Sequence, residues 1–423
     1  MEESVKNRKA VLVGVARSSR EVTACEKSLN ELSRLLDTAG GEETARVLQM
    51  KPVFDPATVI GSGKVAEIAE LCKNEEITLA VFDMELSPSQ IRNLEDGMGG
   101  DVLVLDRSML ILDIFALHAR SGEGKLQVEL AQLRYTAPRL TGKGRELSRL
   151  GGTIGTRGPG ESKLEQDRRH IRHRIDALQA ALGEMEKNRA TMRAARERSG
   201  IPKIAIVGYT NAGKSTLLNT LTDAGVLSED KLFATLDPTT RKLTLPEGED
   251  VLLTDTVGLI RGLPHHLVEA FHSTLEEAAL ADVLLVLADY SDEEREEQVA
   301  VTLETLRSLG AEGKPILFVY NKCDAASEPV PAAPFVREDT VYISARTGEG
   351  IDKLLSALLR LVREGKRRVL LSLPYSESGL LNAIYGAGTV EDVSYENESI
   401  SVTAVLDQKA LGKYRKYIVK EMH

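Results

Sequence analysis

Apolar and polar positions follow two different periods along residues 1–120. Short apolar runs, the pattern of buried strands, occur at 10–16, 44–51, 78–83 and 101–106. Each run is followed by a stretch whose apolar residues recur at the period of an amphipathic helix, at 22–39, 63–73, 87–98 and 107–119. Because repeated strand–helix pairs are typical of a parallel sheet, we expect an N-terminal α/β domain over residues 1–120.

Two longer helical patterns surround a glycine-rich stretch. In residues 123–140, one stripe contains Leu126, Leu130, Leu133 and Ala137. After the stretch, the apolar stripe comprises Leu164, Ile171, Ile175, Leu178, Leu182 and Met185. Two helices joined by a loop are expected to pair antiparallel and to bury such stripes against each other. Residues 121–199 therefore predict an antiparallel helical hairpin, with GGTIGTRGPGES (151–162) at its exposed tip.

The second half of the chain predicts two further domains. A new α/β pattern starts at Ile201, which indicates a domain over residues 200–365. The tail, 366–423, reads as strand, helix, two strands and helix, and so predicts a small α+β domain. The segment EGKRRV, 364–369, is expected to be the linker between the two.

Composition narrows the class of protein. With 423 residues, 42% hydrophobic and 28% charged, the chain is typical of a globular protein of several domains. No apolar run approaches the roughly 20 residues of a membrane span, and the first residues lack a signal-peptide core, so we expect a cytoplasmic protein. Cys25, Cys72 and Cys323 are too scattered for a disulfide framework or a zinc site.

Charge is unevenly distributed. Residues 139–198 carry 15 Lys and Arg against 8 Asp and Glu, a local charge of +7. The rest of the chain carries 39 against 56, or −17, so the overall −10 conceals a basic arm on an acidic body. A basic arm is suited to a polyanion such as RNA, because Lys and Arg bind backbone phosphates with release of counterions. Charge alone also fits a solvated helix with internal salt bridges.

A phosphate-binding pattern opens the third domain. KIAIVGYTNAGKSTLLNTL (203–221) reads as a strand, a glycine loop and the start of a helix. Gly208, Gly213, Lys214 and Ser215 fit G-x-x-x-x-G-K-[ST]. In this pattern backbone N–H groups surround the phosphates, the lysine neutralises β and γ oxygens, and the hydroxyl ligates Mg²⁺.

The identity of the nucleotide base is indicated by the motif NKCD, 321–324, which follows the apolar run PILFVY. The Asp324 carboxylate can accept both the N1–H and the 2-amino protons of guanine, whereas adenine would leave a desolvated charge without a partner. Further on, VYISARTG offers the Ala345 backbone N–H to guanine O6. The order and spacing of these motifs predict GTP and GDP as ligands.

Residues that sense the γ-phosphate are expected between these motifs. In VLLTDTVGLI, Asp255 is expected to hold Mg²⁺ through water and the Gly258 N–H to meet the γ-phosphate. In KLFATLDPTTR, Thr235 is favoured as the threonine that closes over Mg²⁺, with Thr239 second and Thr240 as a further candidate.

The residue after Gly258 is Leu259, where Ras-type enzymes carry the glutamine that orients the attacking water. A leucine side chain cannot position water. We therefore expect slow intrinsic hydrolysis that a partner accelerates. Arg261, His265 and His266 lie nearby, but we interpret each as a solvated loop residue.

The predicted nucleotide site has Lys214, Thr235 and Gly258 in catalytic roles and Ser215 and Thr235 as magnesium ligands. Its full set of residues is Gly208, Tyr209, Thr210, Asn211, Ala212, Gly213, Lys214, Ser215, Thr216, Phe233, Ala234, Thr235, Leu236, Asp237, Asp255, Thr256, Val257, Gly258, Asn321, Lys322, Cys323, Asp324, Ser344, Ala345 and Arg346.

These motifs resemble a known family. GYTNAGKST, FATLD, DTVG and NKCD are similar to the Obg–HflX branch of GTPases, and GGTIGTRGPGESKLEQDRR resembles the glycine-rich segment of the HflX family. The likeness extends to VIGSGKVAEI in the first domain, with Thr153 as a departure from the usual glycine.

The resemblance implies a GTPase that binds the large ribosomal subunit, RNA and protein, and splits stalled or idle ribosomes. The helical arm would reach toward the peptidyl-transferase centre, with Arg157 on the glycine loop at its tip. It also implies a monomer with no DNA partner and no integral membrane segment, located in the cytoplasm with ribosomes or peripherally at the membrane. Some members bind adenine nucleotides near GSGK, 61–64, which here also fits a helix start with Ser62 as its cap.

Two other functions fit parts of the sequence. The first is an RNA-binding scaffold in which the nucleotide site is mainly structural; intact Lys214, Ser215 and Asp255 oppose it, whereas Leu259 mildly favours it. The second is a membrane or signalling switch, which the lack of a lipid anchor or polybasic helix end disfavours. The small C-terminal domain resembles a protein-contact module whose partner the sequence does not name.

Overall fold

The computed structural model describes residues 5–138, 159–197, 201–222, 232–233, 236, 238–261, 272–331, 338–364, 366–396 and 398–422. The chain divides into two compact units. The first comprises residues 1–185 with 229–237 and 260–273, and the second comprises 186–228, 238–259 and 274–423. Two short segments from the middle of the chain thus pack with the first unit.

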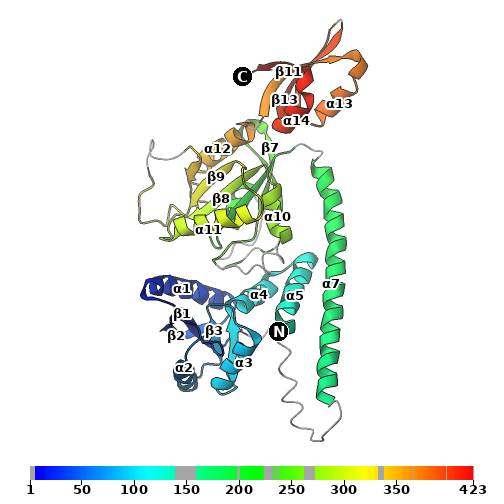
Figure 1. The fold of residues 1–423 in the computed structure, drawn as a ribbon. Coiled ribbons are helices and arrows are strands. Elements are labelled where there is room, and N and C mark those ends of the chain that lie inside the picture. The colour runs from blue at the N-terminus through cyan, green and yellow to red at the C-terminus, as the bar shows by residue number, and fades with distance from the viewer. Residues whose placement is uncertain are drawn as a thin grey trace. The chain divides into compact units, whose positions relative to one another are not determined.

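The first unit contains a parallel four-stranded sheet of order β2-β1-β3-β4 (Figure 1). Its strands are β1 Lys9–Ala16, β2 Glu42–Met50, β3 Leu79–Phe82 and β4 Leu103–Asp106. The connecting helices are α1 Val22–Thr38, α2 Ser62–Glu75 and α3 Pro88–Gly97, with a 3₁₀ turn η1 at Ser19–Glu21. This arrangement confirms the predicted parallel α/β domain.

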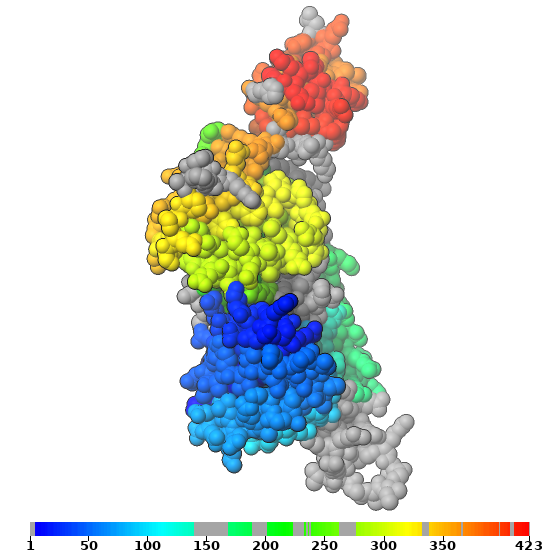
Figure 2. Space-filling view, turned by 60° about the vertical axis from the view of Figure 1, so that its left-hand side comes forward, coloured from blue at the N-terminus to red at the C-terminus, as the bar shows by residue number. Residues whose placement is uncertain are grey.

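The apolar runs of the sequence form the centre of this sheet. Val11, Val13, Ala80 and Phe82 have no exposed surface, because strands of a parallel sheet are covered on both faces. Val81 pairs with Leu12 on one side and with Leu105 on the other. Figure 2 shows residues 5–120 as one continuous packed body, coloured blue to cyan.

Three helices complete the first unit. They are α4 Arg107–His118, α5 Gly122–Thr136 and the long α7 Pro159–Glu197, of which residues up to 185 belong here. Helix α5 packs on α4, where the Gln132 side-chain amide donates to the Leu112 carbonyl at 3.5 Å. A bidentate ion pair of 2.7 and 2.8 Å between Arg174 and Glu129 ties α7 alongside α5.

The burial of these helices differs from the expected stripes. On α5 the expected Leu130 is buried, but so are Gln127, Val128 and Ala131 beside it, whereas Leu126 and Leu133 are half-buried. The physical reason is that α5 has a second neighbour, α4, which takes its most buried face. On the described part of α7, Leu178 is buried at 2% exposure, but Ile171, Ile175, Leu182 and Met185 are only half-buried.

The second unit is built on a six-stranded sheet of order β10-β9-β8-β5-β7-β6. Strand β6 runs antiparallel to β7, and the others are parallel. The strands are β5 Lys203–Gly208, β6 Thr239–Thr244, β7 Asp250–Asp255, β8 Val283–Asp289, β9 Ile316–Asn321 and β10 Thr340–Tyr342. The helices are α8 Lys214–Thr222, α10 His272–Leu280, α11 Arg295–Ser308 and α12 Ile351–Glu364, with a 3₁₀ turn η3 at Pro246–Gly248.

A separate four-stranded antiparallel sheet follows, in the order β12-β13-β11-β14. Its elements are β11 Lys366–Pro374, η4 Tyr375–Glu377, α13 Leu380–Tyr385, β12 Gly388–Tyr395, β13 Ser399–Asp407, α14 Gln408–Tyr414, η5 Arg415–Tyr417 and β14 Ile418–Met422. Its core includes Val369, Leu371, Val402 and Ala404.

Two details of this tail differ from the prediction. The expected linker overlaps β11, which begins at Lys366, because its Arg and Val residues continue into a strand paired with β13. A fourth strand, β14, was not predicted. Three of its five residues, IVKEM, are apolar, but none is fully buried, and the strand is held by pairing with β11.

The predicted fold class is confirmed: a parallel-sheet N-terminal part, a phosphate-loop α/β part and a small α+β part. Among the described residues, we find no helix with the length and apolarity needed to cross a membrane.

Candidate nucleotide-binding site

The phosphate loop lies between β5, which ends at Gly208, and α8, which begins at Lys214. The loop therefore ends at a helix N-terminus, where free N–H groups and the helix dipole favour a phosphate. Gly213 has φ +92°, and a Cβ there would lie 2.3 Å from the Asn321 side-chain nitrogen. The loop can pass this close to Asn321 only because the residue is glycine.

Lys214 is buried at 6% exposure, and its Nζ donates to the carbonyls of Gly208 at 3.1 Å and Tyr209 at 2.8 Å. Burial lowers the pKa of Lys214 to about 8, while the Asp255 carboxylate acts in the opposite direction. A buried lysine held only by carbonyls can exchange them for phosphate oxygens, whose negative charge would raise its pKa again.

Two oxygen-bearing side chains meet beside this lysine. The Ser215 hydroxyl donates to Asp255 Oδ2 at 2.7 Å, and Asp255, at the carboxyl end of β7, has no exposed surface. A hydroxyl and a carboxylate are hard oxygen ligands of the kind Mg²⁺ prefers, so these residues fit a magnesium site. The neighbouring Thr256 hydroxyl instead donates to the Ile206 carbonyl at 2.7 Å and holds β7 against β5.

The segment after Asp255 lies against the phosphate loop. Leu259 donates through its N–H to the Gly208 carbonyl at 3.1 Å and accepts from the Thr210 N–H at 2.8 Å. At Gly258, a Cβ would lie 2.9 Å from the Thr210 Cα, so only glycine allows this approach. The Leu259 side chain is buried at 3% exposure. The structure thus brings the predicted γ-phosphate residue next to the loop.

The base end is organised by Asn321. Its side-chain nitrogen donates to the Ala212 carbonyl at 2.9 Å, and its side-chain oxygen accepts from the Ala345 N–H at 2.9 Å. One buried amide therefore joins three predicted motifs, the phosphate loop, NKCD and SAR. In this structure the Ala345 N–H, which we expected to face guanine O6, is engaged by Asn321.

Asp324 is held as a charged acceptor. Its Oδ1 accepts from the Ser344 hydroxyl at 2.6 Å, and its Oδ2 pairs with Arg346, whose side chain is 78% exposed. The Ser344 hydrogen bond and, secondarily, the Arg346 charge hold the pKa of Asp324 below its usual range. The carboxylate is therefore ionised at neutral pH, as recognition of two guanine N–H groups requires.

Cys323 lies within the same motif, where its N–H donates to the Ile343 carbonyl at 3.1 Å. Burial, with a smaller contribution from nearby Glu349 and Asp324, raises the pKa of its thiol to about 11. At pH 8 about one molecule in a thousand then carries the reactive thiolate.

We therefore expect iodoacetamide to alkylate Cys323 at pH 8 about twentyfold more slowly than glutathione, after allowing for the higher nucleophilicity of a high-pKa thiolate. The rate should rise with pH up to about 11, since only the thiolate reacts. Mass spectrometry of the Cys323 peptide measures it. A rate equal to that of glutathione in the folded protein would contradict this assignment.

The threonine expected over Mg²⁺ cannot be placed, because Ala234, Thr235 and Asp237 lie outside the described residues. The two alternatives are strand residues of β6. Thr239 pairs with Asp255 across the sheet, and the Thr240 hydroxyl lies 2.9 Å from that of Thr254. His265 and His266 also lie outside the described residues.

Two predicted site residues are buried in the first unit. The Phe233 ring meets the Phe115 ring edge to face at 4.6 Å, and Phe233 and Leu236 are 2% and 3% exposed. Nearby in the same unit, Arg107 donates to the Arg261 carbonyl at 3.2 Å.

One predicted cap is wrong. Helix α2 begins at Ser62, its N-cap is Gly61, and no side-chain cap hydrogen bond is formed. Instead the Gly61 N–H donates to the Gln49 side chain at 3.0 Å, so β2 fixes the start of the helix and Ser62 does not cap it.

Sequence reasoning also missed Asp289, whose carboxylate contacts the predicted base residue Lys322. The available signal was its position at the end of the buried run VLLVLAD, because side chains at the carboxyl ends of parallel strands gather at one edge of the sheet.

Comparison with known families covers most of the chain. Residues 26–116 match the family described as GTP-binding GTPase N-terminal, and 118–196 match GTP-binding GTPase Middle Region. Residues 203–322 match 50S ribosome-binding GTPase.

Curated relatives match along nearly the whole chain. A protein named GTPase HflX from Lacrimispora saccharolytica is 49% identical over 94% of this chain and 93% of its own. The GTPase HflX of Escherichia coli K12 is 40% identical over 92% of each chain. Among solved structures, a GTP-binding protein from the archaeon Sulfolobus solfataricus in complex with GDP is 27% identical, with a TM-score of 0.44, covering 84% of this chain and 99% of that chain.

Proposed function

The chain belongs to the HflX family of GTPases, and from this premise we propose that it binds the large ribosomal subunit and splits stalled or idle ribosomes under control of GTP. The observation that carries the proposal is the joining of the phosphate loop to the base motifs through Asn321. This joining supports a site that responds to the bound nucleotide. An RNA-binding scaffold whose nucleotide site is mainly structural would not require Gly258 to pack against the phosphate loop.

The proposed roles in the site follow from its contacts. The N–H groups at the start of α8 and the Lys214 ammonium bind the phosphates, and Asp324 binds the guanine edge. Ser215 and Asp255, with Thr235 as proposed third residue, would hold Mg²⁺. When bound, Mg²⁺ neutralises charge that develops on the β and γ oxygens. The Gly258 N–H reports whether the γ-phosphate is present.

Hydrolysis by this site is proposed to depend on the ribosome. Leu259 is buried and offers the attacking water no hydrogen bond. The missing contribution must then come from a group that is positioned when the partner binds, as trans-acting groups do in other GTPases. Large subunits would supply or order that group.

Helix α7 is the proposed RNA-binding arm. On its described part, Arg169 and Arg172 are exposed, while Arg174 is paired with Glu129. Exposed arginines on a long helix can contact successive phosphates without cost to the core. We place the protein in the cytoplasm as a monomer that associates with ribosomes, and the glycine-rich loop 151–162 at the working end of the arm.

Co-sedimentation with isolated large subunits tests this function. We expect stoichiometric binding with a non-hydrolysable GTP analogue and at least tenfold weaker binding with GDP. The Lys214→Ala variant, which loses the phosphate contact, serves as control and should bind weakly with either nucleotide. Equal binding of the unaltered protein in both nucleotide states would favour the RNA-binding scaffold.

The proposed RNA-binding role of α7 predicts how large-subunit binding depends on salt concentration. Replacing Arg169 and Arg172 by glutamine should lower the slope of log K against log[salt] for large-subunit binding by about one to two, since each phosphate contact contributes roughly 0.7–0.9. The matched control replaces Lys73 and Arg92, exposed residues of α2 and α3, and should leave the slope unchanged. GTP affinity should be the same in all three proteins. Equal slopes for the two variants would exclude α7 as the phosphate-binding surface.

A further inference from the structure

Lys322, the second residue of NKCD, has an ion-pair partner outside the predicted site. Its Nζ lies 2.7 Å from Oδ2 of Asp289, the last residue of β8. The two side chains are 28% and 16% exposed, so the pair is partly shielded from water. Solvent and salt screen such a pair less than an exposed one, and it can hold the lysine in one place.

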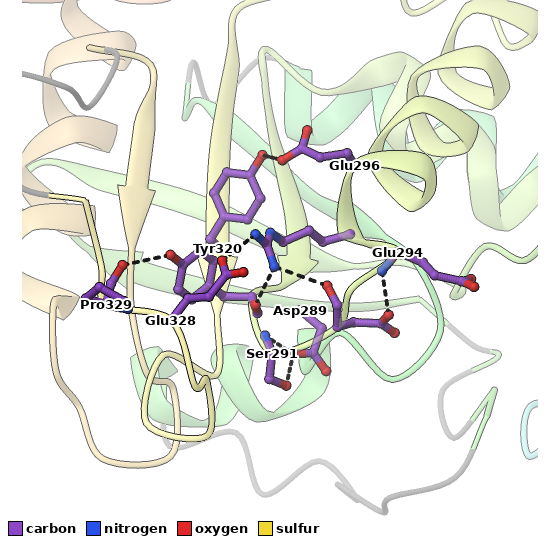
Figure 3. Close-up of polar contacts among 10 residues, drawn as sticks. Asp289, Ser291, Glu294, Glu296, Tyr320, Glu328 and Pro329 are labelled. Atoms are coloured by element: carbon purple, nitrogen blue, oxygen red, sulfur yellow. Dashed lines mark hydrogen bonds and ion pairs between the residues drawn. The ribbon is translucent and has the colours of Figure 1, made fainter.

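The Asp289 carboxylate is itself fixed. Its Oδ1 accepts from the Ser291 N–H at 3.0 Å and from the Ser291 hydroxyl at 2.6 Å, as Figure 3 shows. Oδ2 is thereby turned toward Lys322. Asp289 also pairs with Asn321 across β8 and β9, and the next residue, Tyr290, donates its N–H to the Asn321 carbonyl at 2.7 Å. The carboxylate therefore keeps a fixed register with the base motif.

Side-chain contacts with neighbouring segments also hold the turn that follows Asp289. The Arg295 guanidinium lies 4.9 Å from the centre of the Tyr290 ring and donates to Glu328 at 2.8 Å. The Tyr290 hydroxyl donates to the Pro329 carbonyl at 3.0 Å, and the Tyr320 hydroxyl donates to Glu296 at 2.9 Å (Figure 3). These bonds tie the segment after β8 to the segment after β9, on which Lys322 stands.

Lys322 lies between the two residues that organise the base end. Asn321 is bonded to the phosphate loop, and Asp324 is held by Ser344. The Lys322 backbone has φ +64°, a left-handed conformation that a lysine adopts only where its surroundings require it. With its ammonium paired to Asp289, the lysine offers its hydrocarbon stem, which can cover an apolar surface such as the face of a base.

We propose that Asp289 is a positioning residue for the guanine base: it holds the Lys322 ammonium so that the lysine stem lies against the base and slows nucleotide release. The proposal rests on the proposed assignment of Lys322 to the nucleotide site. Asp289 acts only through Lys322, so its removal matters only when that lysine is present.

The test uses the full-length protein and ribose-labelled fluorescent GDP, with no ribosomes. Stopped-flow displacement by excess GDP gives the dissociation rate. Asp289→Asn should speed dissociation about fivefold, the scale of a partly exposed ion pair. The matched control is Asp292→Asn, which removes the same charge from the same turn. Asp292 accepts from Glu294 and Gln298. It should change the rate less than twofold.

A double-mutant cycle separates positioning from a structural effect. Lys322→Met should also speed dissociation, and Asp289→Asn added to Lys322→Met should have no further effect. If the Asp289→Asn rate equals that of the unaltered protein, or if the two effects simply multiply, the proposal is overturned. If Lys322→Met itself changes nothing, the assignment of Lys322 to the site fails, and the proposal fails with it. Ribosome binding enters none of these measurements, so a failure of the proposed function is recognised separately.

Discussion

Asp324→Asn is expected to weaken GTP binding at least tenfold and to turn the preference toward xanthosine triphosphate. The carboxylate accepts two guanine N–H groups, and the amide that replaces it loses one acceptor and presents a donor without a partner. Xanthine has an oxo group where guanine has its 2-amino group, and that oxygen accepts from the new amide. Equilibrium titration with both labelled nucleotides measures the change.

The fixed surroundings of Asp324 sharpen this test. The Ser344 hydroxyl holds one of its oxygens, and the single oxygen of an asparagine can accept the same hydrogen bond, so the new side chain should keep its position although the Arg346 ion pair is lost. Glu349→Gln is a suitable control, because it removes one charge from an exposed residue nearby. Unchanged GTP affinity in Asp324→Asn, with xanthosine triphosphate still rejected, would show that another group reads the base.

Shortening the loop 151–160 is expected to abolish ribosome splitting while sparing most of the binding to large subunits. Binding is proposed to rest on the length of the arm, whereas splitting is proposed to require its tip to reach into ribosomal RNA. Light scattering of intact ribosomes reports splitting, and co-sedimentation reports binding in the same preparation.

The variant in which glutamine replaces Arg169 and Arg172 serves as the comparison, because it should affect binding and splitting in the opposite way. Arg169 and Arg172 stand on the described part of α7. Their replacement should weaken binding, with splitting falling only in proportion. If the loop-shortened protein splits ribosomes at the unaltered rate, the glycine-rich stretch is only a connector between two helices.

Much of the fold could be predicted because burial leaves a strong periodic signal. The apolar runs around Val11, Val81 and Leu105 all form strands of one parallel sheet, with β1 and β3 at its centre and β4 at its edge, and all three residues are buried. The phosphate loop was equally readable, because Gly213 and Lys214 must have these identities for the backbone to pass close to Asn321 and for phosphate to be bound.

What the sequence did not reveal depends on partners distant in the chain. Strand β14 forms by pairing with β11, and the start of α2 is fixed by Gln49 on β2. Asp289 forms its ion pair with Lys322, a residue more than thirty positions away in the chain. Phe233 was grouped with the nucleotide residues by its motif, yet its ring packs on Phe115. Apart from the strand-end position of Asp289, none of these contacts leaves a local pattern of spacing or composition.

The GTPase rate with and without large ribosomal subunits tests the central claim most directly. Leu259 provides no group to orient water, so the isolated protein should hydrolyse GTP slowly, and saturating large subunits should raise the rate at least tenfold. Lys214→Ala should abolish the stimulated rate and so excludes a contaminating GTPase. A rate that is the same with and without large subunits, in protein that binds GTP normally, would contradict a GTPase switched by the ribosome.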